Sequence, residues 1–167
     1  MKGGGSSQFV FDLKGCPPQV TVQGGTIQEA NQSTFPALAG NNLAIYLLTL
    51  QPGAVRIPHW HPDAAELDYC LSGTARIGLA FPDGEWQRFE VAAGQISVIP
   101  QGWFHYIENP GTEPMSMLVI FNNSAPNDIG ISEGFQAIPK EVLALTFNVE
   151  ADRFKGLDYH VGYIAPQ

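Results

Sequence analysis

Short apolar runs separated by turn signals occupy most of the chain, and they constrain its fold more than any other feature. Each run has strand length and is rich in β-branched and aromatic residues, and several are divided by turns such as the Pro-Asp-Gly at 82–84. The runs are QFVFDL, QVTVQ, NLAIYLLTL, AVRIPHW, ELDYCL, TARIGLAF, WQRFEV, ISVIP, WFHYIEN and MSMLVIFN. This pattern predicts an all-β protein, with an antiparallel barrel or sandwich over about residues 10–122.

The chain changes character after this region. NNSAPND at 122–128 is a polar loop, whereas SEGFQAIPKEVLALTFNVEADRF at 132–154 contains helix formers, with Pro139 where a first helical turn accepts proline. We expect short helices between about Ile131 and Phe154 and then an irregular tail to Gln167. With 167 residues and no repeat, the simplest organisation is one domain over residues 1–167, with the helical appendage and tail at about 128–167.

Composition excludes some partners. With a formal net charge of −8 and only eight Lys and Arg, the chain has no basic surface for phosphates, so we expect no nucleic-acid partner. Cys16 and Cys70 have no neighbours at metal-ligand spacing, and we expect two reduced structural thiols. No apolar run of signal-peptide or membrane length follows MKGGGSSQ, which favours a soluble, cytoplasmic protein without a membrane partner.

The segment GAVRIPHWHPDAAE at 53–66 holds two of the four histidines. Alternate residues of a strand share a face, so His59 and His61 project together and their imidazoles can share one ion. A turn at Pro62-Asp63 would bring Glu66, at the start of the next strand, back beside them. A second segment, GQISVIPQGWFHYIEN at 94–109, supplies His105 after a Pro-Gln-Gly turn. Together these residues predict a site for a divalent transition metal with room for solvent or substrate.

An alternative is that these are ordinary strand histidines, two exposed and one packed in the core. That alternative would explain any single histidine. However, three of the chain's four histidines fall at positions from which they could share one ion with each other and with Glu66. The combination favours a metal site. His160, in LDYHVGY, lies outside the pattern and we expect it to be structural.

Both histidine segments resemble the sequence motifs of the cupin superfamily, which implies a double-stranded β-helix, or jelly-roll barrel. The residues that carry the resemblance are Gly53, His59, His61, Glu66 and Gly73 in the first motif and Gly94, Pro100, Gly102, His105 and Asn109 in the second. The segments GGTIQEA, PGAVRIPHWHP, SGTARI and PKEVL further resemble oxalate decarboxylases. Those enzymes typically carry two cupin domains, and this chain is most similar to their second domain.

The resemblance implies a manganese ion held by His59, His61, Glu66 and His105, with oxalate and dioxygen as partners. The donor set alone does not choose the metal, because Fe, Co, Ni, Cu or Zn would also bind such ligands. The resemblance also implies that Arg56 holds the substrate carboxylate. Strand parity would turn Arg56 away from His59 unless Pro58 introduces a bulge.

The departures from these relatives concern the proton donor. In oxalate decarboxylases a mobile loop carries a glutamate for this purpose, whereas the corresponding loop here, NNSAPND, contains none. Val119 stands where the second domain of the relatives often has another carboxylate. Asp128 at the end of the loop and Asp68, on the face of Glu66 by parity, are the remaining acidic candidates. Each is also compatible with a surface or supporting position.

Three functions stay open. The first is an enzyme acting on oxalate or a similar small carboxylate, as decarboxylase or oxidase. The second is a dioxygenase or isomerase using another metal on a different oxygenated substrate, which a wider apolar pocket would favour. The third is a metal-loaded binding protein without turnover. We also expect a homo-oligomer, a dimer or hexamer, formed through edge strands and the terminal helices, where ALTF and FNV offer apolar surface.

Overall fold

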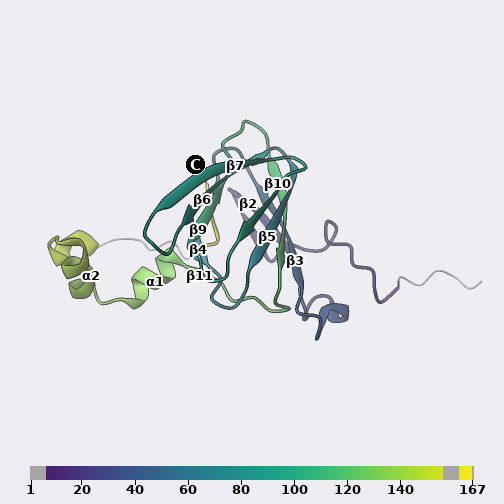
Figure 1. The fold of residues 1–167 in the computed structure, drawn as a ribbon, viewed down its shortest axis with the longest axis horizontal. Helices are drawn as coiled ribbons and strands as arrows, with labels where there is room; N and C mark the ends of the chain where they lie inside the picture. The colour runs from purple at the N-terminus through teal and green to yellow at the C-terminus, as the bar shows by residue number, and fades with distance from the viewer. Residues whose placement is uncertain (1–6, 156–161, 167) are drawn as a thin grey trace, which may run out of the picture.

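Two antiparallel sheets face each other and enclose the core of the protein (Figure 1). The computed structural model describes residues 7–155 and 162–166. The first sheet has the strand order β1-β2-β3-β10-β5-β8, and the second has the order β11-β4-β9-β6-β7, with β12 paired to β4. The strands are β1 (Val20–Val22), β2 (Gly25–Ala30), β3 (Ala44–Leu50), β4 (Val55–Trp60), β5 (Glu66–Ser72), β6 (Thr74–Ala80), β7 (Trp86–Ala92), β8 (Ile96–Ile99), β9 (His105–Glu108), β10 (Met115–Phe121), β11 (Ile129–Gly130) and β12 (Ile164–Ala165).

Alternation of side chains fills the space between the sheets. Along β10, Met115, Met117, Val119 and Phe121 are buried, while the residues between them are partly exposed. The same alternation on the neighbouring strands builds one apolar core from both sheets. The predicted all-β, cupin-type fold with short C-terminal helices is therefore confirmed.

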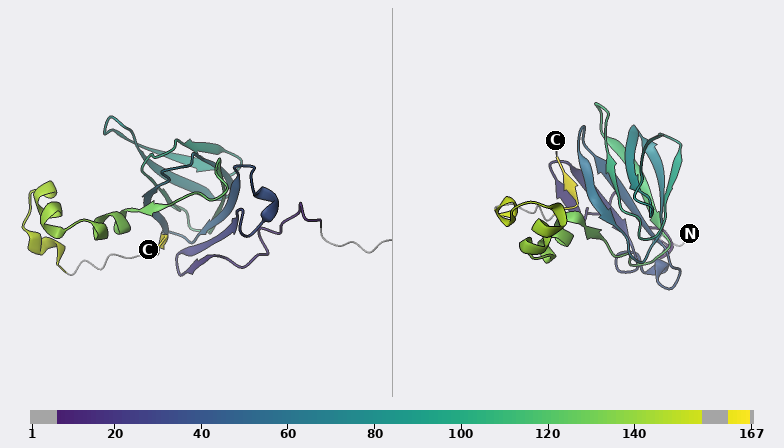
Figure 2. Two further views of the ribbon diagram at one scale, coloured as in Figure 1. Left: turned by 90° about the horizontal axis from the view of Figure 1, so that it is seen from below. Right: turned by 60° about the vertical axis from the view of Figure 1, so that its left-hand side comes forward.

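The helices are short and lie outside the sheets. They are the 3₁₀ helix η1 (Pro36–Leu38), α1 (Ile131–Ala137), α2 (Lys140–Phe147) and the 3₁₀ helix η2 (Ala151–Phe154). We call residues 131–154 the helical arm, because they project away from the barrel from the end of β11 (Figures 1 and 2). Ring contacts of Phe147 with Phe135 and Phe154, at centroid distances of 5.9 and 6.0 Å, hold the arm together. None of the described helices is long and apolar enough to cross a membrane.

The structure differs from the predicted strands at both ends of the chain. QFVFDL at 8–13 is not a strand: its backbone makes local turn hydrogen bonds, such as Val10 N–H to Ser7, and Phe11 stacks on Phe35. The predicted irregular tail instead returns to the barrel as β12, where Ile164 pairs with Arg56. The prediction for His160 lies outside the described residues.

A bulge in β4 reorients its side chains. Arg56 pairs with Ile107 of β9 and His59 pairs with His105, so three steps along β4 match two steps along β9. Arg56 and His59 are consequently both buried, although simple alternation would place them on opposite faces. Pro58, which cannot donate to the ladder, lies within the bulge, which meets the condition stated above for Arg56 to share a face with His59.

Glycine is required where β2 begins beside β3. Gly25 has φ +150°, and a Cβ built on it would lie 2.0 Å from the carbonyl oxygen of Thr49. Gly94 also has a positive φ, +85°, but a Cβ there would have no neighbour within 4 Å. Of these two glycines, Gly25 therefore combines an unfavourable backbone conformation with a backbone clash, and Gly94 has the unfavourable conformation alone.

We predict that Gly25→Ala lowers the free energy of unfolding by about 3 kcal/mol or more, because a strand must shift to admit the methyl group. Gly94→Ala serves as the control and should cost about 1–2 kcal/mol from backbone conformation alone. Chemical denaturation monitored by circular dichroism measures both. Equal losses in the two variants would contradict the assigned clash.

Candidate metal centre

Three imidazoles and one carboxylate converge between the two sheets. One ligand atom from each of His59, His61, Glu66 and His105 lies within 4.8 Å of the others, and all four residues are buried. His59 and His105 are direct partners in the β4–β9 ladder, and the turn at 62–63 returns the chain so that Glu66 begins β5 beside them. The residues predicted from the two motifs are thus brought together.

Backbone carbonyls orient the three imidazole rings. Nδ1 of His59 donates to the carbonyl of Ile57 (2.7 Å), and Nδ1 of His105 donates to that of Trp103 (3.0 Å). Nδ1 of His61 donates to the carbonyl of Asn127 (2.8 Å), in the loop after β10. A neutral imidazole that donates from Nδ1 keeps an unprotonated Nε2, the state in which histidine binds a metal.

The Nε2 atoms of His61 and His105 face a buried carboxylate. Oε2 of Glu66 lies 3.1 Å from Nε2 of His61 and 3.3 Å from Nε2 of His105. Neither Oε2 of Glu66 nor Nε2 of His105 has a hydrogen-bond partner among the described residues. Lone pairs and a carboxylate that face each other away from water need a cation or a proton between them.

The pKa shifts of these residues describe how the cluster binds protons in the absence of a metal. Burial and the nearby Arg56 hold the pKa of His59 well below its usual value, so this ring is neutral. Burial alone would lower the pKa of His61 and raise that of Glu66. Contact with Glu66 instead raises the pKa of His61, and contacts first with His105 and then with His61 hold the pKa of Glu66 well below its usual value. A proton and a metal therefore compete for the space between His61 and Glu66. Three nitrogens and one oxygen, all oriented inward, fit a divalent transition metal.

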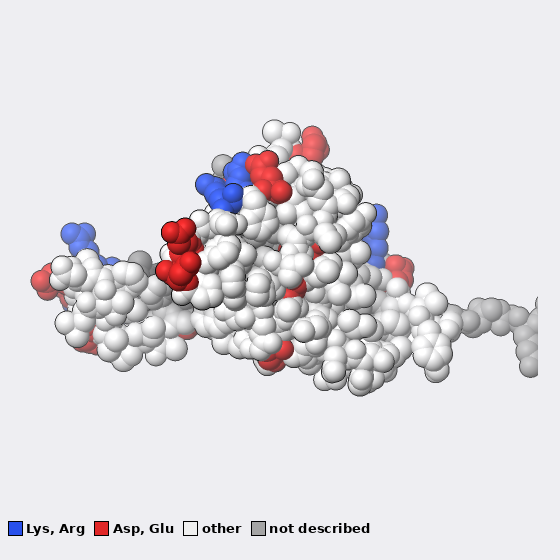
Figure 3. Space-filling model, in the orientation of Figure 1, with Lys and Arg blue, Asp and Glu red and all other residues white. Residues whose placement is uncertain are grey.

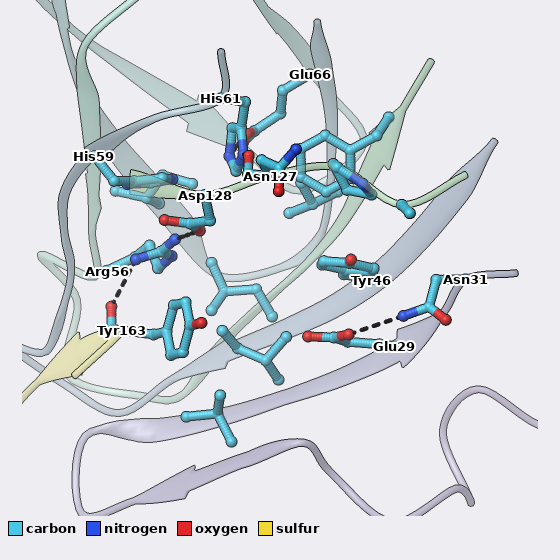
Figure 4. Close-up of a pocket in the computed structure, with 18 of the residues that line it drawn as sticks. Glu29, Asn31, Tyr46, Arg56, His59, His61, Glu66, Asn127, Asp128 and Tyr163 are labelled. Carbon is cyan, nitrogen blue, oxygen red and sulfur yellow. Dashed lines mark hydrogen bonds and ion pairs between the residues drawn. The ribbon is translucent and has the colours of Figure 1, made fainter. Parts of the chain in front are cut away.

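Three of the four cluster residues, His59, His61 and Glu66, line a cavity of about 460 Å³ between the sheets (Figure 4). Side chains from β2, β3 and β10 of the first sheet face side chains from β4 and β9 of the second. The cavity lining includes His59, His61 and Glu66, the polar residues Glu29, Asn31, Tyr46, Arg56, Asn127, Asp128 and Tyr163, and the apolar residues Val20, Ile27, Leu48, Ile107, Val119 and Phe121.

Arg56 lies in this cavity beside the cluster. Its Nη2 forms an ion pair with Asp128, its Nη1 donates to the carbonyl of Tyr163 (3.1 Å), and its guanidinium lies 5.1 Å from the Tyr163 ring centre. Burial raises the pKa of Asp128, and the adjacent Arg56 opposes that shift. Arg56 and Asp128 thus both lie next to the candidate metal site, and the charge of each is balanced by the other.

Asp68 is placed differently from Asp128. It is fully buried, accepts a hydrogen bond from Ser97 Oγ (2.9 Å), and is absent from the lining of the cavity. Burial and the neighbouring Glu66 hold the pKa of Asp68 well above its usual value. Asp68 is therefore not a surface group. Its position suits a side chain that supports Glu66 better than one that contacts substrate.

The loop at 122–128 is fastened over the cavity by several hydrogen bonds. The backbone N–H and side-chain amide of Asn127 donate to the two carboxylate oxygens of Asp63, at 2.9 and 2.7 Å. Ser124 is bonded to Gln32 through both its backbone carbonyl and its hydroxyl. Because the Asn127 carbonyl also accepts from His61, the loop position and the orientation of a candidate ligand are linked.

Several cavity residues were not identified from the sequence. Tyr163 belongs to the tail that was expected to be irregular. Tyr46 lies in a run that was predicted only as a strand. Glu29 lies in GGTIQEA, which was not among the predicted strands and was related only to oxalate decarboxylases, although it forms β2. The alternation of side chains along a strand predicts which residues face inward, but it does not distinguish a cavity lining from an ordinary core.

Known proteins resemble this chain over nearly its whole length. Residues 11–154 match the cupin family. An oxalate decarboxylase of Arthroderma benhamiae is 33% identical over 162 residues, which are 96% of this chain and 38% of that protein. Spherulin-1A of Physarum polycephalum is 29% identical over 147 residues, 87% of this chain and 60% of that protein.

A solved structure of Bacillus subtilis oxalate decarboxylase, from a study of its Mn(II) centres, superimposes with a TM-score of 0.83 at 28% identity. The match covers 93% of this chain and 40% of that one, so this chain spans less than half the length of the oxalate decarboxylases it matches. The matched motifs, the two-sheet fold and the converging histidines agree with one another: the chain belongs to the cupin family.

Proposed function

We propose that this cupin is a metal-dependent enzyme that acts on a small carboxylate, with oxalate as the first substrate to test. His59, His61, Glu66 and His105 would hold the metal, and Arg56 would hold the carboxylate. The observation that carries the proposal is the set of three imidazoles whose Nε2 atoms are left free by Nδ1–carbonyl hydrogen bonds and that converge with a buried carboxylate at the edge of a cavity.

A bound divalent metal would act as a Lewis acid and, if it is redox-active, would accept or donate an electron. Manganese is supported by the donor set and by the Mn(II) centres named for the Bacillus subtilis enzyme. Other divalent metals bind nitrogen-rich sites more tightly, so availability in the cell also decides which ion is bound. Dioxygen is a proposed second partner of an oxalate-acting enzyme.

The chain's own residues would position the substrate. Arg56 presents a rigid guanidinium fork that suits a carboxylate, and it is buried next to His59. In the structure its partner is Asp128, so a substrate carboxylate must compete with Asp128 for the fork. An Asp128 carboxyl released in this way would stand beside the substrate, where a side chain with a raised pKa can deliver a proton.

A second candidate function is supported by the cavity itself. Its volume of about 460 Å³ exceeds what oxalate occupies, and apolar side chains supply much of its lining. This favours a cupin dioxygenase or isomerase that acts on a larger oxygenated substrate at the same centre. A metal-loaded protein without turnover remains the third outcome to test.

One experiment separates these functions. The metal content of protein purified without added metal would be measured by mass spectrometry, and oxalate turnover would be followed with assays that resolve formate from hydrogen peroxide. Formate indicates a decarboxylase and peroxide an oxidase. A fully metal-loaded protein that produces neither would contradict an oxalate-acting enzyme.

We predict that His61→Ala and His105→Ala each lower metal affinity by at least about 100-fold, because each removes a direct donor from a site with four. The apolar core is unaffected, so the circular dichroism spectrum should stay unchanged. Gln87→Ala, at an exposed position on β7, is the control and should keep the affinity of the unmodified protein. Full metal occupancy of His105→Ala after dialysis against a chelator would show that the assigned ligand set is wrong.

We predict opposite effects for the two members of the ion pair. Arg56→Ala should lose oxalate binding by about tenfold or more without losing metal, because the guanidinium contacts the substrate and not the ion. Asp128→Asn should tighten oxalate binding, because it removes the competing anion. Calorimetric titration of the metal-loaded proteins measures both. Weaker binding in both variants would show that Asp128 helps to hold the substrate instead of competing with it.

We propose further that copies of this chain associate through the helical arm and the edge strand β8. Leu145 on the arm and Ile96 on β8 are 84% and 62% exposed, and Val142 and Val98 beside them are about half exposed. Charged side chains are sparse over much of the face seen in Figure 3. Exposed apolar side chains of this kind are typical of association surfaces.

Sedimentation at micromolar concentration should show a dimer or larger species, and Leu145→Glu or Ile96→Glu should shift it toward the monomer. Gln87→Glu, at an exposed polar position on β7, controls for the added charge. An unmodified protein that sediments as an 18.1 kDa monomer would remove the proposal.

A further inference from the structure

The wall of the cavity opposite Arg56 carries a second polar pair. Glu29 of β2 and Tyr46 of β3 are direct partners in the register of the first sheet, so their side chains leave neighbouring points on the same face. Both line the cavity that contains the candidate metal centre. Figure 4 shows them, with Asn31, across the cavity from Arg56 and Asp128.

This pair has hydrogen-bonding capacity to spare. Oε2 of Glu29 accepts a hydrogen bond from the Asn31 amide (3.1 Å), but Oε1 accepts none from the described residues. The Tyr46 hydroxyl can both donate and accept. Burial raises the pKa of both side chains, which is the direction expected for polar groups that are partly withdrawn from water. The pair offers an acceptor and a donor to a group inside the cavity.

Apolar side chains separate the two polar ends. In the ladder of the first sheet Tyr46 pairs with Val119, where a carboxylate would have continued the polar surface toward the metal site. Leu48 and Ile107 face the cavity from opposite sheets. Side chains without oxygen or nitrogen lie between the labelled ends in Figure 4. A ligand that reaches both ends therefore needs an apolar middle.

The volume of the cavity agrees with such a ligand. At about 30 Å³ for each water in the liquid, 460 Å³ corresponds to roughly fifteen waters. Oxalate, with two carbons and four oxygens, would occupy only the end beside Arg56. A ligand that fills the cavity would displace water from apolar walls and would pair both polar ends.

We propose that the substrate of this site is a hydroxylated carboxylate with an apolar body of about the size of a phenyl ring. Its carboxylate lies against Arg56 and its hydroxyl lies between Glu29 and Tyr46. This inference rests on the proposed function, since it uses the same metal centre and the same arginine. It replaces oxalate by a larger member of the same chemical class.

The test compares carboxylates that differ only in the distal hydroxyl. Binding to the manganese-loaded protein would be measured by calorimetry for 4-hydroxybenzoate, benzoate, 4-hydroxyphenylacetate, phenylacetate and oxalate. Two lengths are included because the hydroxyl must reach the far wall. We expect at least one hydroxylated compound to bind about tenfold more tightly than its unhydroxylated partner and more tightly than oxalate, because one hydrogen bond to a charged acceptor is worth about that factor.

Variants of the far wall identify the source of that preference. Tyr46→Phe keeps the ring that packs edge-to-face on Phe121 and removes only the hydroxyl, and Glu29→Gln keeps the shape of the carboxyl. Each should reduce, several-fold, the ratio of the affinity for the hydroxylated compound to the affinity for its unhydroxylated partner. Tyr69→Phe, at an exposed position on β5, is the matched control and should change neither.

The outcomes separate this inference from the proposed function. If benzoate and oxalate bind in a way that depends on Arg56 while the hydroxyl adds nothing, the inference is overturned and the proposed function stands. A hydroxyl preference that persists in both Tyr46→Phe and Glu29→Gln also overturns it. If the metal-loaded protein binds none of the five carboxylates, the proposed function fails and the inference fails with it.

Discussion

The site depends on three hydrogen bonds from imidazole Nδ1 to backbone carbonyls. They set the tautomer and the direction of His59, His61 and His105, so that each Nε2 lone pair faces the same point beside Glu66. Two of the carbonyls lie two residues before their own histidine, within or just before a strand, and the third comes from Asn127 in the loop at 122–128. Asp63 holds that loop in place, so one hydrogen-bond network fixes both the rim of the cavity and the orientation of His61.

The bulge at Pro58 gives the site its second chemical group. Without it, Arg56 would point out of the barrel and the metal centre would face a cavity with no fixed cation for a substrate. With it, Arg56 is buried beside His59 and is balanced by Asp128, which keeps the guanidinium from being an unpaired buried charge. Because Arg56 is already paired, a substrate carboxylate that binds it must replace the Asp128 carboxylate.

Much of this could be predicted from the sequence, for identifiable reasons. Strand periodicity predicted the fold class, and the spacing of His59, His61, Glu66 and His105 predicted their convergence, because a strand and a tight turn have nearly fixed geometry. The sequence marked Pro58 as a position where a bulge could form, because proline cannot donate to a ladder. Tyr163 was missed because the β12 pairing is long-range and only two residues long. The pairing of Glu29 with Tyr46 was missed because β2 was not among the predicted strands, and because the sequence of one strand does not fix its register with another.

The most direct test of this account is a crystal structure of the manganese-loaded protein with anomalous scattering from the metal. The account predicts one strong anomalous peak bounded by Nε2 of the three histidines and one oxygen of Glu66, each at about 2.0–2.3 Å, with the Nδ1–carbonyl hydrogen bonds intact. A peak ligated through Nδ1, a peak elsewhere in the barrel, or no peak at full manganese loading would contradict it.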